Sequence, residues 1–452
     1  MTNRFFTRRL RIDRVERQSH LYQLLLRQAH SVILSSTSQS TSIRQCAGNL
    51  TLIVDPSLSA SDILNSTRNR RGWRADRACR WRQLGLRPMT SSTIRVLDLF
   101  AGAGGLTAGF HESSERFETV SAVEMDPAAA ASFEATFGRG IVYTGSIQDW
   151  LSSDRMPRDV DVVVGGPPCQ GFSTLGKQDV EDERNSLWVQ YAKTLNLVKP
   201  RYFVVENVAA FAKSTQFEQF VAATQPGGWL EDYAFRHAVL NAADYGAPQA
   251  RKRAVLIGHH KDLPFPGFPG ATHSATGEDG KKRHSTVSEW FAGVPALPDR
   301  DSVFSARSVE HHGKVFPGEF APRELHWSRS YQDLSLKRFA SIPPGGNRFD
   351  LPDELKAPCW RKHTSGSGDV MGRLHADRPS VTIRTEFFKP EKGRYLHPTE
   401  NRAITHYEAA LLQGFPDNHR FVGSKTAIAR QIGNAVPIPL GKAIAQQLER
   451  HF

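Results

Sequence analysis

The stretch Ile94-Arg-Val-Leu-Asp-Leu-Phe-Ala-Gly-Ala-Gly-Gly-Leu106 carries the clearest structural signal in the chain. Its apolar run, 94–100, has the length and composition of a buried strand. The glycines that follow lead into a helical stretch from Leu106, so a strand turns directly into a helix. Glycines at such a turn let a ligand approach the backbone and free the helix N-terminus to bind it. Considered alone, the motif is equally compatible with a tight turn that binds nothing.

The same alternation of short apolar runs with helix-length segments continues beyond this turn. Further strands are predicted at 120–124, 160–164, 202–206 and 253–257, and helices at 127–137, 187–197, 408–415 and 443–448. Strands separated by helices indicate an α/β fold with a parallel sheet and right-handed crossovers. Ligands of such sheets bind beyond the carboxyl ends of the strands. The loops after Phe100, Val164 and Glu206 are therefore expected to lie together at the carboxyl edge of the sheet, at the mouth of one binding site.

Charge is distributed very unevenly along the 452 residues. The whole chain has 58 Lys and Arg against 46 Asp and Glu, a formal net charge of +12. Residues 1–88 hold 16 Arg, no Lys and five acidic residues, whereas the remainder holds 42 basic and 41 acidic residues. This distribution excludes a uniformly basic protein that coats DNA.

Residues 1–88 are predicted to be an extension outside the functional fold, with a Ser/Thr tract at 35–42 and an Arg-dense run at 68–82. A basic arm that contacts DNA and a targeting segment remain alternatives, because Arg-rich, acid-poor N-termini suit both. The expected organisation is then a catalytic and cofactor-binding domain at 89–258, a smaller irregular domain at 259–375, and a segment at 376–452 that returns to the first domain.

Several classes of protein are excluded by simple counts. The chain has no run of 18 apolar residues, so no membrane span is expected. Its four cysteines are too few and too scattered for a disulfide framework or a zinc site, and no metal site is predicted.

Polar residues gather at the predicted mouth. Glu124 ends the second strand, where a carboxylate can accept both hydroxyls of a ribose. Cys169 lies in the rigid loop Gly165-Gly-Pro-Pro-Cys-Gln-Gly-Phe-Ser173, a position suited to a nucleophile. Glu206 ends a further strand. Gln249, Arg251 and Arg253 alternate toward one side of the segment 249–253. This pattern suits a buried anion or base-edge site, and a solvated edge strand is the alternative.

Taken in order, six blocks resemble the cytosine-5 DNA methyltransferase family of bacterial modification enzymes. The resemblance extends over about residues 94–450. Its blocks are FAGAGGL (100–106), GGPPCQGFS (165–173), ENV (206–208), QARKR (249–253), RAIT through LLQGFPD (402–417) and QIGNAVP (431–437). The resemblance implies a Rossmann-like sheet that binds S-adenosyl-L-methionine. It also implies a target-recognition domain between the fourth and fifth blocks, where 259–375 already differs in composition.

The resemblance assigns roles to individual residues. It implies Cys169 as the nucleophile, Glu206 as the acid at ring nitrogen 3, and Arg251 and Arg253 as donors to the base carbonyl. The cofactor positions that it implies are Phe100, Gly102, Gly104, Gly105, Glu124, Ile147, Pro168, Asn434 and Val436. One position departs from the family pattern: Ser146 stands where an acid commonly binds the adenine amino group, which predicts slightly weaker cofactor affinity.

The expected function is methyl transfer to carbon 5 of a flipped-out cytosine in a specific sequence of double-stranded DNA, within a restriction–modification system. The alternatives are an RNA (tRNA) cytosine methyltransferase and a non-catalytic DNA-binding homologue. A nicotinamide enzyme is disfavoured, because the glycine spacing is not G-x-G-x-x-G. A monomer in the bacterial cytoplasm is expected, with a cognate endonuclease as a functional partner rather than a bound subunit.

Overall fold

The computed structural model describes residues 41–46, 49–54, 92–168, 187–298, 307–362 and 365–452. The chain divides into two compact units, Met1–Leu84 and Gly85–Phe452. In the first unit, β1 (Thr41–Cys46) and β2 (Asn49–Val54) pair as an antiparallel hairpin. The second unit holds the remaining described elements, including the predicted sheet.

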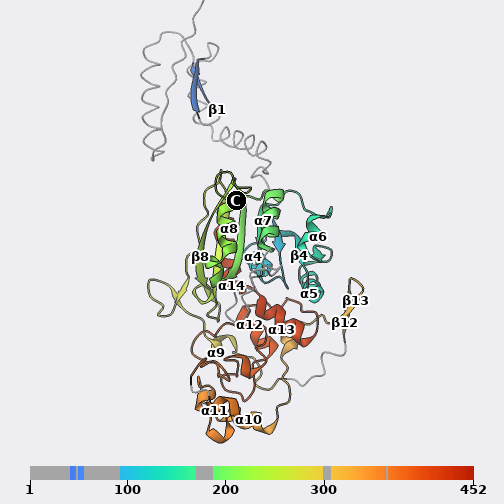
Figure 1. Ribbon diagram of the computed structural model, residues 1–452, viewed down its shortest axis with the longest axis vertical. Coiled ribbons are helices and arrows are strands. Elements are labelled where there is room, and N and C mark those ends of the chain that lie inside the picture. Colours follow the sequence, from blue (N-terminus) through green and yellow to red (C-terminus); the bar gives the residue numbers. More distant parts are fainter. Residues whose placement is uncertain (1–40, 47–48, 55–91, 169–186, 299–306, 363–364) are drawn as a thin grey trace, which may run out of the picture. The chain divides into compact units, whose positions relative to one another are not determined.

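Seven strands form one sheet in the order β5-β4-β3-β6-β7-β9-β8 (Figure 1). They are β3 (Ile94–Leu99), β4 (Phe117–Glu124), β5 (Val142–Thr144), β6 (Val162–Gly165), β7 (Tyr202–Val208), β8 (Tyr233–Asn241) and β9 (Lys252–His260). Neighbouring strands are parallel from β5 to β7, whereas β9 is antiparallel to both β7 and β8. The carboxyl ends of the parallel strands therefore share an edge with the start of β9.

Helices cover both faces of this sheet. They are α4 (Gly105–Ser113), α5 (Pro127–Phe137), α6 (Ile147–Leu151), α7 (Leu187–Val198), α8 (Thr215–Ala223) and α14 (Ile438–Glu449). On β6, Val162 and Val164 pack toward α4 and α14, while Val163 packs toward α6, α7 and α8. Successive side chains of a strand point to opposite faces, so a fully apolar strand needs cover on both sides. The predicted α/β class is confirmed.

The remaining described helices and strands of the second unit lie between β9 and α14 in the chain. The helices and strands are β10 (His273–Ser274), β11 (Lys282–Arg283), α9 (Val287–Trp290), β12 (Ser308–His311), β13 (Lys314–Pro317), α10 (Asp333–Ala340), α11 (Pro358–Lys362), α12 (His406–Gln413) and α13 (Lys425–Asn434). Short 3₁₀ turns occur at Ala209–Lys213, Ala242–Tyr245, Pro322–Leu325, Arg348–Asp350, Asp353–Leu355 and Pro390–Lys392.

The region 259–375 does not have a fully separate core. Phe320, Leu325 and Trp327 share one apolar cluster with Leu412 of α12 and Ile428 of α13. A smaller cluster around Phe339 supports α10. Figure 1 shows α12 and α13 together in red, with α10 and α11 in orange beyond them. The division at 258 and 375 stays a prediction.

Most predicted elements appear within two or three residues of their expected bounds. The helix 127–137 is found as predicted, because the Asp126 side chain accepts from the backbone N–H of Ala128 and Ala129 and Pro127 starts the helix. The C-terminal helix packs against α4, as expected. The strands β5 and β8 were not anticipated. Segment β5 is very short, and β8 is a mostly half-exposed edge strand with a weak apolar pattern. Within the described residues, no helix is both long enough and apolar enough to cross a bilayer.

Candidate active site

The glycine-rich loop joins β3 to α4 at the carboxyl edge of the sheet. Phe100 has a φ of 58°, Gly102 of 57° and Gly104 of 85°, so the backbone passes through left-handed conformations. Gly104 takes the N-cap position of α4 without a side-chain cap, and the N-terminus of this helix is therefore open toward the loop. Phe100 adopts a conformation that is uncommon outside glycine, which is a feature of functional loops.

Glu124 is fixed beside this loop by two backbone donors. The amide of Gly102 donates to its Oε2 over 2.8 Å, and the amide of Asp126 donates to its Oε1 over 2.7 Å. Burial raises the pKa of Glu124, and the hydrogen bonds from Asp126 and Gly102 oppose that rise. The second strand thus presents a partly buried carboxylate next to the glycines, as the sequence predicts.

Asp98 is a buried acid that sequence reasoning missed. Its side chain is 1% exposed, and Thr107 in the first turn of α4 donates to Oδ2 over 2.6 Å. Burial raises the pKa of Asp98 to about 7, with the hydrogen bond from Thr107 lowering it and the charge of Glu124 raising it. An acid inside an otherwise apolar strand was the available signal. Asp98 ties the strand to the helix on either side of the glycine loop.

Ser146 begins the short helix α6. Its Oγ accepts from the Asp149 amide over 3.1 Å and donates to Asp149 Oδ2 over 2.7 Å. The hydroxyl is therefore committed to capping its own helix. Next to it, Ile147 is buried in the core.

A hairpin from the region 259–375 reaches this corner. His311, at the end of β12, shares a 2.9 Å hydrogen bond between Nε2 and the Oγ1 of Thr144, and its Nδ1 lies 3.6 Å from Glu134 Oε2 on α5. Burial lowers the pKa of His311, and Glu134 opposes that shift. No sequence signal indicated this contact, which links positions far apart in the chain.

The loop after β6 is pinned from the neighbouring strand. Asn207 Nδ2 donates to the carbonyl of Pro167 over 2.9 Å. A Cβ added to Gly166 would lie 3.2 Å from Glu206 Oε2, so the loop runs directly against that carboxylate. Pro168 is the last described residue of this loop, and Cys169 lies outside the described residues.

Glu206 and Arg253 form an ion pair at the same edge. Arg253 Nε lies 2.8 Å from Glu206 Oε1, and both side chains are largely buried. The two strands bring them together because β9 runs antiparallel to β7 and pairs Arg253 with Val208. An acid and a guanidinium are thus held side by side, next to Gly166.

Arg251 and Gln249 point into the protein instead. Arg251 Nη1 donates to the carbonyls of Ile383 and Gly433 over 2.8 and 3.0 Å. Burial, followed by the charge of Arg253, lowers the pKa of Arg251 to about 9. Gln249 is fully buried and bonded to Gln413. Strand β9 begins only at Lys252, so the expected single strand face contains Arg253 but not these two residues.

The segment 434–436, near the C-terminus, packs against the end of the glycine loop. A Cβ on Gly105 would lie 3.0 Å from both the Ala435 Cβ and the Val436 carbonyl. Asn434 is exposed and Val436 is buried. A side chain at position 105 would be crowded, and this contact joins Val436, the last of the predicted cofactor positions, to the glycine loop.

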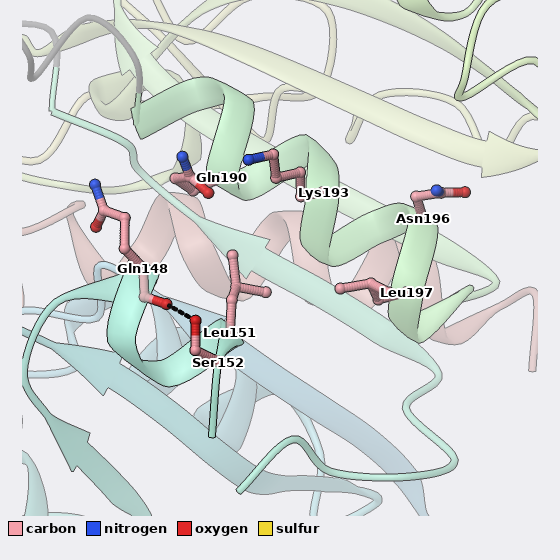
Figure 2. A pocket seen from close by; sticks show the side chains of 7 residues that line it. All are labelled: Gln148, Leu151, Ser152, Gln190, Lys193, Asn196 and Leu197. Atoms are coloured by element: carbon pink, nitrogen blue, oxygen red, sulfur yellow. Dashed lines mark hydrogen bonds between the residues drawn. The ribbon is translucent and has the colours of Figure 1, made fainter. Parts of the chain in front are cut away.

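The hollow drawn in Figure 2 lies away from this edge. It is lined by α6 and α7, with Leu151, Leu197 and Lys193 among its side chains. None of the predicted site residues lines it. The lining of this hollow is neutral except for Lys193, whereas the predicted site at the carboxyl edge carries Glu124, Glu206 and Arg253.

The arrangement identifies a class of protein. A mostly parallel seven-stranded sheet of this order, with a glycine loop after β3 and an acid at the end of β4, is the fold of S-adenosylmethionine-dependent methyltransferases. The chain matches the C-5 cytosine-specific DNA methylase family over residues 94–450 and belongs to that family. Members of this family are DNA (cytosine-5-)-methyltransferases that use S-adenosylmethionine as the methyl donor.

Individual relatives agree with this assignment. The chain is 34% identical to the type II methyltransferase M.XorII of Xanthomonas oryzae over 383 residues, covering 78% of this chain and 84% of that protein. It is 33% identical to the type II methyltransferase M1.HphI of Haemophilus parahaemolyticus, covering 78% and 86%. Among solved structures, a putative DNA modification methyltransferase encoded within an E. coli prophage superposes with a TM-score of 0.57 at 24% identity, covering 79% and 99%. That likeness shows the fold.

Proposed function

We propose that this chain transfers a methyl group from S-adenosylmethionine to carbon 5 of a cytosine in a specific sequence of duplex DNA. One observation carries the proposal. The Glu206–Arg253 ion pair and the loop pinned by Asn207 lie at the sheet edge that also carries the glycine loop and Glu124. A base and a nucleoside cofactor bound at this edge would therefore meet.

The cofactor would be held by the predicted positions. Glu124, oriented by two backbone donors, can accept the ribose hydroxyls, and Gly102, Gly104 and Gly105 leave backbone open beside Phe100. Ile147, Pro168, Asn434 and Val436 complete the proposed set. When bound, S-adenosylmethionine supplies an electrophilic methyl group on a positively charged sulfur.

The chain's own residues would activate the base. The thiolate of Cys169 adds to carbon 6 of cytosine, and the ring electrons shift toward carbon 5, which becomes nucleophilic. Glu206 holds a proton or strong hydrogen bond at ring nitrogen 3, and Arg253 donates to the base carbonyl while orienting Glu206. After methylation, solvent water accepts the proton of carbon 5, the double bond between carbons 5 and 6 re-forms, and the bond to sulfur breaks, which restores the Cys169 thiolate.

Arg251 would act through its neighbours. Its bonds to the carbonyls of Ile383 and Gly433 join the start of β9 to α13, so it positions Arg253 relative to the segment 434–436. We assign it a positioning role within the proposed site.

The substrate would be duplex DNA with the target base flipped out, because carbons 5 and 6 cannot be reached in a stacked pair. We propose 259–375 as the target-recognition domain, between 89–258 and 376–452. A type II modification role, a monomeric state, a bacterial cytoplasmic location and a cognate endonuclease as functional partner belong to the same proposal. The similarity to M.XorII and M1.HphI, both type II methyltransferases, supports the type II modification role.

Transfer of labelled methyl from S-adenosylmethionine to duplex DNA, with tRNA as the competing acceptor, tests the proposal. Wild type should label DNA, and Cys169→Ser should lose activity by several orders of magnitude while still binding cofactor. Bisulfite sequencing of DNA from expressing cells would identify the target sequence. Labelling of tRNA alone, or full activity in Cys169→Ser, would contradict the proposal.

A further inference from the structure

A second hollow opens beside the segment 249–253. We name it the basic hollow; it is lined by Ala250, by residues between 367 and 384, and by 392–395. Two backbone hydrogen bonds form its floor: Ser380 N donates to Pro248 O, and Ala250 N donates to Ser380 O, each over 2.8 Å. The hollow is therefore attached to the chain segment that leads into Arg253.

Positive charge dominates the lining. Arg378, Arg384, Lys392 and Arg394 face one carboxylate, Asp369. Arg394 pairs with Asp369 at 3.2 Å and donates further hydrogen bonds to backbone carbonyls. Its role is therefore to hold the lining of the hollow together.

The other cations are available at the surface. Arg384 is exposed, and Arg378 is 59% exposed beside the still more exposed Asp377 at 3.5 Å. Lys392 is 51% exposed, 3.3 Å from Glu386. Exposed pairs of this kind contribute little to stability, so a phosphate can take the place of the carboxylate.

A buried polar atom in the lining lacks a partner. Ser380 is 2% exposed, and its Oγ makes no hydrogen bond within the described residues. Leaving a buried hydroxyl without a hydrogen-bond partner carries a desolvation penalty. A ligand that supplies an acceptor inside the hollow would remove that penalty.

The hollow is also close to the proposed base site. Arg253 comes three positions after Ala250, and three residue steps span at most about 11 Å. One DNA strand rises about 3.4 Å per nucleotide. A backbone phosphate in the hollow would thus lie within about three nucleotides of a cytosine at Glu206 and Arg253.

We infer that the basic hollow binds a backbone phosphate of the DNA strand that carries the flipped cytosine, with Arg378 and Arg384 as donors and Ser380 beneath them. The inference rests on the proposed function, because that function places the cytosine. Such a contact sets the register of the strand and carries no sequence information of its own.

The experiment measures the affinity of the full chain for a labelled duplex that contains the target sequence found by bisulfite sequencing, and for a non-target duplex, across a range of salt concentrations. Arg378→Gln and Arg384→Gln should each weaken binding. The double variant leaves the phosphate without a cationic donor from these two residues, so it should reduce the slope of log K against log salt by about 1, as expected for one lost phosphate contact. An unchanged slope in the double variant would overturn the inference.

Two matched controls lie elsewhere on the molecule. Arg158→Gln removes an exposed arginine before β6, at the opposite edge of the sheet, and Lys193→Gln removes the lysine of the hollow in Figure 2. Both should keep the wild-type slope. An equal loss in the controls would show a general charge effect and would also overturn the inference.

Ser380→Ala separates a ligand role from a structural one. Because Oγ has no partner in the described residues, the variant should unfold at the wild-type temperature or higher and bind DNA more weakly. Lower stability with unchanged DNA affinity would remove Ser380 from the site.

Failure of this inference is distinguishable from failure of the proposed function. If the variants reduce the salt slope on duplex DNA but the wild type methylates no DNA, the phosphate site is supported and the proposed function is rejected. If the wild type methylates DNA but the variants leave the slope unchanged, the proposed function is supported and the phosphate site is rejected. Slope changes seen with tRNA and not with duplex DNA would overturn the inference.

Discussion

At the scale of single residues, the site combines groups that act on a ligand with groups that hold them. Glu124 and Glu206 keep their orientations through Gly102 and Arg253 respectively. Asp98 has a different environment: it is buried beneath the glycine loop and accepts from Thr107. Its titration should therefore be visible in the stability of the protein.

Burial raises the pKa of Asp98 from 3.8 to about 7, so the folded protein retains a proton that the unfolded chain releases near pH 4. Stability must then fall as the pH rises through the window from about 4 to 7. Asp98→Asn, which cannot ionise, should lose less stability across that window, with a difference on the order of a few kcal/mol. Urea unfolding of both proteins between pH 4 and 8 measures this.

Thr107→Val serves as the control for Asp98. It removes the hydrogen bond to the buried acid without removing the acid, so it should lower stability at every pH. Parallel pH profiles for wild type and Asp98→Asn would contradict the assigned titration.

Ser146→Asp restores the acid that the family commonly places at this position. Asp caps a helix about as well as Ser, so α6 should remain formed. The new carboxylate would meet Asp149, now 2.7 Å from Oγ, and should lower stability slightly. Cofactor affinity should rise a few-fold in calorimetry, with Ser146→Ala as the control that loses the cap. Unchanged affinity in Ser146→Asp would contradict the prediction of weaker binding in wild type.

At the scale of elements, the sheet needs close cover because its central strands are apolar on both faces. Helices α4 and α14 provide it on one side, and they approach so closely that Gly109 lies against the backbone of α14. This crossing connects the helix that follows the glycine loop with the C-terminal end of the chain. The loop geometry therefore depends on a contact between distant segments.

A Cβ on Gly109 would lie 2.7 Å from the Lys442 amide, whereas one on Gly441 would meet nothing closer than 3.4 Å. Gly109→Ala should thus destabilise the protein by about 1–3 kcal/mol through overpacking. Gly441→Ala should be neutral or gain up to about 1 kcal/mol from helix propensity. Denaturant unfolding compares the two, and equal effects would contradict the difference in packing.

At the scale of the whole molecule, +11 of the net charge of +12 belongs to residues 1–88, outside the described catalytic fold. The residues beyond position 88 are nearly neutral, with 42 basic and 41 acidic residues. Attraction to DNA must then come from local groups such as those of the basic hollow. Counterion release depends on the number of phosphates that Lys and Arg contact, so a local cluster of these residues is enough to bind DNA.

A chain that starts at Met89 should fold and methylate DNA at the wild-type rate. The unit Gly85–Phe452 contains the sheet and the described parts of the proposed site, and the prediction follows from that completeness. Thermal unfolding and methyl transfer, compared with the full chain, measure it. A large loss of DNA affinity in the shorter chain would identify residues 1–88 as a working arm.

The sequence by itself determined the fold class and the order of the motifs. Apolar runs, glycine turns and the Asp126-Pro127 cap act locally, and they marked β3, β4, β6, β7 and α5. The same local signals placed Glu124 and Glu206 at strand ends. They could not reveal β8, whose pairing with β9 defines it, or the burial of Asp98.

Only the tertiary structure decided which polar residues meet. Arg251 and Arg253 are two residues apart, yet one bonds to Gly433 and the other to Glu206. His311 at Thr144 and the hollow around Ser380 likewise join segments more than a hundred residues apart. Such contacts depend on how the strands and loops pack in three dimensions, and local propensity contains no record of distant partners.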